Sequence, residues 1–86
     1  MIKVVKFSAT WCGPCRALSP VFNEVKSQMP DVVFQEIDID QNSDLAIKYN
    51  VRGVPTIVIE KDNQEVTRKS GIIMNAALTQ LINSYK

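Results

Sequence analysis

The sequence predicts an α/β domain in which a mixed four-stranded sheet carries helices on both faces. Three observations predict this class. Two long segments carry apolar residues at helical spacing, β-rich runs alternate with them, and a strand–helix–strand unit at the start requires a parallel strand pair. No linker or internal repeat divides the 86 residues, so we expect one domain over residues 1–86 with the order βαβαββα.

The first half of the chain is expected to form a strand, a long helix, a second strand and a short helix. Residues 2–8 are β-rich and end at the turn formed by residues 11–14. From Cys15 onward apolar residues recur every three or four positions until Pro30 ends the helix. This apolar stripe consists of Leu18, Val21, Phe22, Val25 and Met29. Residues 32–39 form the second strand, and polar residues 40–43 cap a short helix over residues 44–49.

The second half is expected to form a hairpin and a last helix. Strands at residues 56–60 and 65–70 are joined by a turn in which Asp62 and Asn63 tolerate positive φ. Gly71 ends the strand pattern. The last helix is expected to bury one stripe of side chains. This stripe consists of Met74, Ala77, Leu78, Leu81, Ile82 and Tyr85.

Composition excludes most kinds of active site. The chain has no histidine, which excludes Ser-His-Asp and Cys-His nucleophiles and histidine-bound metals. Its two cysteines cannot complete a four-thiolate metal site within one chain, so we expect no metal. A net charge of +1 gives no general attraction to nucleic acid or membranes, and no segment is apolar enough to span a membrane. Since no signal peptide is recognisable, we expect a cytoplasmic location.

Cys12-Gly13-Pro14-Cys15 is the motif that carries chemistry. It lies where the first strand ends and the long helix begins, and the N-terminus of a helix stabilises a thiolate. Gly13 keeps the site accessible, and Pro14 fits the first helical turn. From these positions Cys12 is expected to attack a target disulfide and Cys15 to resolve the mixed disulfide. A purely structural disulfide, two inert thiols and a metal shared between two chains are the alternatives.

Three segments of this chain resemble the thioredoxin family. They are Ala-Thr-Trp-Cys-Gly-Pro-Cys-Arg at residues 9–16, Ile-Asp-Gln-Asn at residues 39–42 and Val-Arg-Gly-Val-Pro-Thr at residues 51–56. The resemblance covers nearly the whole chain and implies the thioredoxin fold and a protein dithiol–disulfide oxidoreductase. The strand and helix that usually come first in the family are absent, so the chain resembles the short thioredoxins of archaea and phages.

The resemblance also implies a substrate-binding surface around the two cysteines. Val54-Pro55 matches the family's loop with a cis proline, whose exposed backbone pairs with an extended substrate segment as an added strand. Gly53 is expected to permit the tight turn of this loop. Gly71-Ile72 resembles a third side of the surface, although Ile72 is also consistent with an ordinary core position.

Three residues near the motif are expected to support it, and the sequence departs from the family pattern at Lys6, Glu36 and Ser8. Trp11 is expected to pack under the site and shield it. Lys6 stands where thioredoxins usually carry a buried aspartate, and Glu36 stands where a lysine usually partners that aspartate. We expect Lys6 and Glu36 to pair behind Cys15, with Glu36 accepting its proton. The alternative is that the Lys6 side chain extends to the surface. Ser8, where an aromatic residue is common, implies wetter surroundings.

Family resemblance also implies how the protein is used. We expect no bound cofactor beyond the redox-active Cys12–Cys15 disulfide, with electrons from NADPH through a thioredoxin reductase. The expected partners are disulfide-containing proteins, in a monomer that serves electron transport and cell redox homeostasis. One alternative is a glutaredoxin-like enzyme using glutathione, although Cys-Pro-Tyr-Cys and a Gly-Gly pair at Gly71 are missing. Another is a non-catalytic binding subunit of a larger complex.

Overall fold

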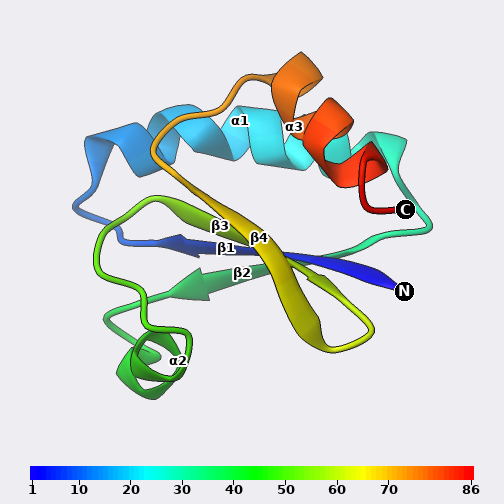
Figure 1. The fold of residues 1–86 in the computed structure, drawn as a ribbon. Coiled ribbons are helices and arrows are strands. Elements are labelled where there is room, and N and C mark those ends of the chain that lie inside the picture. The colour runs from blue at the N-terminus through cyan, green and yellow to red at the C-terminus, as the bar shows by residue number, and fades with distance from the viewer.

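The computed structural model describes residues 1–86 and contains one four-stranded sheet between helices, as Figure 1 shows. Its elements are β1 (Ile2–Ser8), α1 (Gly13–Gln28), β2 (Val33–Asp38), α2 (Ser43–Lys48), β3 (Thr56–Lys61), β4 (Gln64–Ser70) and α3 (Asn75–Asn83). The strand order is β2-β1-β3-β4, with β1 parallel to β2 and antiparallel to β3, and β3 antiparallel to β4. Helices α1 and α3 cover one face and α2 the other, which confirms the predicted class (Figure 1).

The two central strands are buried on both faces, as their apolar sequences require. Along β1, Val4 contributes to the core beneath α1 and α3, whereas Val5 and Phe7 contribute to the smaller core on the α2 side. Leu18 on α1 and Leu78 on α3 are fully buried in the first of these cores. Each such side chain stabilises the fold by about 1.5–3 kcal/mol. The sheet and α1 are therefore held rigidly relative to one another, and the candidate site lies at their junction.

The hairpin turn forms as predicted. Asp62 and Asn63 have φ angles of 53° and 70°, which is the left-handed region that a tight hairpin of this kind needs. The strands extend one residue further toward this turn than expected, so that β3 ends at Lys61 and β4 begins at Gln64.

The last helix differs from its prediction at its N-terminal end. Helix α3 begins at Asn75, so Met74 precedes it as the N-cap residue and is 67% exposed. Ala77 is exposed as well, and only Leu78 and Ile82 are fully buried on this helix. The predicted stripe therefore fails at Met74 and Ala77, whereas Leu81 and Tyr85 are partly buried against the core. No helix of the structure has the length and apolarity needed to cross a membrane.

The register of the parallel pair determines what lies near the cysteines. Lys6 stands opposite Glu36, and Ser8 stands opposite Asp38. The carboxyl ends of β1 and β2 therefore lie side by side, directly before the loops that lead into α1 and α2. Ligands and reactive groups gather at this edge of an α/β sheet.

Candidate active site

Cys12 and Cys15 form a disulfide at the start of α1, with their Cα atoms 5.3 Å apart. Cys12 is the N-cap residue, and the backbone N–H of Cys15 donates to the Cys12 sulfur at 3.2 Å. Both side chains are nearly buried, Cys12 being 5% exposed and Cys15 3% exposed. When the disulfide is reduced, the same N–H and the N-terminus of the helix stabilise a thiolate on Cys12.

The loop before β3 lies against the disulfide. The Val54–Pro55 peptide bond is cis, which confirms the prediction. The carbonyl oxygen of Val54 lies 3.8 Å from the Cys12 sulfur, and no backbone hydrogen bond in the chain uses the N–H or the C=O of Val54. Thr56 holds the loop from behind, because its hydroxyl donates to the carbonyl of Gly53 at 2.7 Å. A donor and an acceptor of the main chain therefore remain unpaired beside the disulfide.

The turn at Gly53 does not depend on the conformational freedom of glycine. Its φ is not in the positive region, and a Cβ there would meet no atom within 4 Å, so the turn itself does not demand glycine. Gly71 does demand it, with φ of 86°. The N–H of Gly71 donates to the carbonyl of Pro55 at 2.9 Å, which ties the end of β4 to the cis-proline loop. Ile72 is 51% exposed, so the core interpretation of this residue is wrong.

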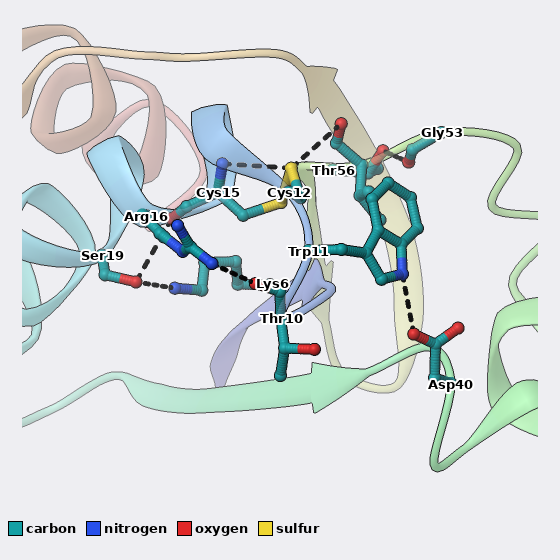
Figure 2. Close-up of a disulfide and its surroundings, with 11 residues drawn as sticks. Lys6, Thr10, Trp11, Cys12, Cys15, Arg16, Ser19, Asp40, Gly53 and Thr56 are labelled. Carbon is teal, nitrogen blue, oxygen red and sulfur yellow. Dashed lines mark hydrogen bonds between the residues drawn. A yellow bond between two sulfur atoms is a disulfide. The ribbon is translucent and has the colours of Figure 1, made fainter.

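Trp11 does not pack under the motif as predicted. Its side chain is 65% exposed and lies on the surface beside Cys12, and its indole Nε1–H donates to the Asp40 carboxylate at 2.8 Å (Figure 2). An indole N–H needs a polar partner, and here the partner lies in the exposed loop after β2, which holds the ring outside the core. Trp11 therefore adds an apolar face to the surface next to the disulfide.

Lys6 and Glu36 form the predicted ion pair. The Lys6 ammonium lies 3.0 Å from the Glu36 carboxylate, with the lysine side chain fully buried and the glutamate side chain 52% exposed. The alternative in which Lys6 extends to the surface is therefore wrong. The ammonium also lies 5.0 Å from the centre of the Phe22 ring, within the range of a cation–π interaction.

An open hollow of about 360 Å³ lies behind the disulfide, between the end of the sheet and α1. It is lined by Ser8, Ala9, Thr10, Cys15, Arg16, Ser19, Glu36 and Asp38. Ser8 at this position agrees with the expectation of wetter surroundings. The hollow places the Glu36 carboxylate and Cys15 around one solvent-accessible space.

Two residues beside the site escaped the sequence analysis. Ser19 accepts a hydrogen bond from the Lys6 ammonium at 3.0 Å and donates to the carbonyl of Cys15 at 3.2 Å. Its spacing of four residues after Cys15 was the available signal, since residues four apart share one face of a helix. Asp40 belongs to the capping residues and to the Ile-Asp-Gln-Asn segment, but its contact with Trp11 spans 29 positions of sequence and has no local signal.

A second hollow, of about 450 Å³, contains none of the predicted site residues. Lys3, Lys48, Tyr49, Glu60, Asn63 and Glu65 line it. Burial raises the pKa of Tyr49, and so does its hydrogen bond to Glu60 at 3.0 Å. No group of three or more cysteine, aspartate or glutamate side chains is arranged to hold a metal ion. Cys15 of the disulfide lines the first hollow and not the second.

Comparison with known proteins gives one consistent result. A family model described as Thioredoxin matches residues 1–84. A thioredoxin of Chlamydia pneumoniae is 42% identical over 82 residues, covering 95% of this chain and 80% of that protein.

Solved structures agree with the sequence matches. The crystal structure of Fasciola hepatica thioredoxin superimposes with a TM-score of 0.92 at 41% identity, covering 99% of this chain and 81% of that one. A mutant thioredoxin from Halobacterium salinarum gives a TM-score of 0.92 at 42% identity, covering 98% of this chain and 74% of the other.

Proposed function

Since the chain belongs to the thioredoxin family and is a thiol–disulfide oxidoreductase, we propose that it reduces disulfides in other proteins through Cys12 and Cys15. The observation that carries this proposal is the redox pair at the N-terminus of α1, next to the unpaired backbone of Val54. Residues 1–86 act in it as a single domain.

In the first step the Cys12 thiolate attacks a target disulfide. A bond forms between the Cys12 sulfur and one target sulfur, and the other target sulfur leaves as a thiolate that takes up a proton. An extended target segment pairs with the N–H and C=O of Val54, as strands added to an exposed edge do. The exposed apolar side chains of Trp11 and Ile72 and the turn at Gly71 bound the same surface.

In the second step the Cys15 thiolate attacks the Cys12 sulfur of the mixed disulfide. The Cys12–Cys15 disulfide forms, and the second target sulfur leaves. The target has then gained two electrons and two protons, which the dithiol has lost. We assign the acceptance of the Cys15 proton to Glu36, because its carboxylate and Cys15 line the same hollow and Lys6 holds the carboxylate in place.

Replacing Glu36 with glutamine is expected to slow resolution by about a hundredfold, the usual contribution of general base catalysis. Rapid-quench measurement of mixed-disulfide decay checks this result. Glu24→Gln, an exposed glutamate on α1, is the matched control. A resolution rate in Glu36→Gln equal to that of the wild type would refute this assignment.

Electrons for the next cycle are proposed to come from NADPH through a thioredoxin reductase. The protein then works as a cytoplasmic monomer in electron transport. Reduction of the Cys12–Cys15 disulfide by purified thioredoxin reductase with NADPH, and not by glutathione, is the expected result. Faster reduction by glutathione would favour the glutaredoxin-like alternative instead.

The proposed function as a whole is tested by following the turbidity of an insulin solution to which the protein is added, with dithiothreitol as the electron source. The protein is expected to accelerate precipitation of the insulin B chain, because reduction of insulin releases that chain. A Cys12→Ser/Cys15→Ser double variant serves as the control and is expected to match the reagent alone. Equal rates with and without the wild-type protein would refute the proposal and favour a non-catalytic binding role.

A further inference from the structure

Lys6 is the one ionisable side chain in the fully buried core. A buried charge costs several kcal/mol unless its partners replace its hydration. Lys6 has three such partners: the Glu36 carboxylate at 3.0 Å, the Ser19 hydroxyl at 3.0 Å and the face of Phe22 at 5.0 Å. Figure 2 shows the lysine reaching from β1 to Ser19, on the helix that begins at the disulfide. The cation is therefore held in place next to the redox helix.

Ser19 links this cation to Cys15. An ammonium group can only donate, so the Ser19 oxygen accepts from Lys6 and its own proton points elsewhere. In the structure that proton is donated to the carbonyl oxygen of Cys15 at 3.2 Å. Side chains on an α-helix lean toward the N-terminus, so the hydroxyl of Ser19 lies over the turn that contains Cys15. A hydroxyl polarised by a cation is a stronger donor than an isolated one.

We propose that Ser19 is a positioning residue for the redox reaction, through which Lys6 stabilises the thiolate of Cys15. When the disulfide opens, the Ser19 hydroxyl rotates from the carbonyl of Cys15 to its sulfur, while the carbonyl keeps its bond within the helix. No proton transfer is needed for this step. The inference rests on the proposed function, in which Cys15 must form a thiolate to resolve the mixed disulfide.

Two other charged side chains that line the hollow form hydrogen bonds with backbone groups. Arg16 donates to the carbonyl of Thr10 at 2.8 Å, and Asp38 accepts the backbone N–H of Asp40 at 2.8 Å. On the other side of β1, the residue paired with Lys6 is the apolar Ile57. Lys6 and its partner Glu36 are therefore the charged residues that act on the Cys15 thiolate through Ser19.

Cys15 can be observed alone, because the chain has only two cysteines. In a Cys12→Ser background, the ultraviolet absorbance of the thiolate gives the pH midpoint of Cys15. Ser19→Ala is expected to raise this midpoint by about one pH unit, a tenfold loss in the ratio of thiolate to thiol. Ser19→Thr keeps the hydroxyl and is expected to restore the midpoint. Ser27→Ala, which also removes a hydroxyl bonded to a carbonyl of α1, is expected to leave it unchanged.

The link through Lys6 has its own test. Lys6→Met removes the charge at similar volume, and it leaves Glu36 half-exposed to water rather than buried. Lys6→Met is expected to raise the pH midpoint of Cys15 by about as much as Ser19→Ala does. The double variant Lys6→Met/Ser19→Ala is expected to show a shift little larger than that of either single variant. Coupled residues show such non-additivity. Fully additive shifts, or a midpoint that Ser19→Ala leaves unchanged, would overturn the proposal.

These outcomes are separable from failure of the proposed function. The pH midpoint of Cys15 is measured without any target protein. If insulin is not reduced while the midpoint shifts as described, the proposed function fails and the contact of Ser19 with Cys15 stands. If insulin is reduced and the midpoint does not move, the inference about Ser19 alone is overturned.

Discussion

Replacing Cys12 with serine is expected to reduce the rate of protein-disulfide reduction by at least about a thousandfold, because a serine hydroxyl is not ionised at neutral pH and does not attack sulfur. The geometry predicts this loss for Cys12 in particular. Its sulfur accepts the N–H of Cys15 at 3.2 Å and lies 3.8 Å from the carbonyl oxygen of Val54, where a target segment would pair. Initial rates of insulin reduction with dithiothreitol measure the effect.

Cys15→Ser is the informative comparison for this prediction. It is expected to stop turnover too, but only after one attack, so that a mixed disulfide accumulates. If Cys12→Ser kept appreciable activity while Cys15→Ser lost the first step, the two roles would have to be exchanged.

The charge-reversing variant Lys6→Glu is expected to destabilise the fold by about 3–5 kcal/mol, the usual cost of breaking a buried ion pair. The new carboxylate would be fully buried beside Glu36, with no cation to compensate it. Small domains have about 5–15 kcal/mol of stability in total, so this change would remove a large fraction of it. Urea unfolding followed by circular dichroism measures the loss.

Reversing both charges gives the control that identifies the cause. Because the two residues stand opposite each other on β1 and β2, Lys6→Glu combined with Glu36→Lys rebuilds the pair with opposite polarity. This double variant is expected to recover most of the lost stability. Lys69→Glu, an exposed lysine on β4, is expected to change stability by no more than about 0.5 kcal/mol. A Lys6→Glu variant as stable as the wild type would contradict the buried pair.

Local sequence signals predicted the architecture well. All seven elements occur in the predicted order, because apolar spacing and turn residues are read from neighbouring positions. The hairpin at Asp62 and Asn63 is an example, since its positive φ angles depend on the two residues themselves. The pair of Lys6 and Glu36 was also predictable, since the family resemblance gave the register of the two strands.

Features that depend on how elements pack could not be predicted in this way. Trp11 was expected beneath the site, but Asp40 holds its indole at the surface through a contact between the loops that follow β1 and β2. Ser19 looked like an ordinary helix residue, because its contact with Lys6 depends on the rotation of α1 over the sheet. Met74 was assigned to a buried stripe and instead precedes its helix, exposed to solvent. The errors at Trp11 and Ser19 concern side chains whose partners are distant in sequence.

The central claim is that Cys12 attacks and Cys15 resolves, and trapping the mixed disulfide tests it most directly. The Cys15→Ser variant is incubated with a disulfide-containing peptide, and the adduct is located by mass spectrometry. We predict a stable adduct on Cys12 in this variant and little adduct on Cys15 in the reciprocal Cys12→Ser variant, because the Cys12 sulfur lies beside the backbone of Val54 where a target pairs, whereas Cys15 lies within the first turn of α1. Absence of an adduct on Cys12, or equally fast formation on Cys15, would contradict the account.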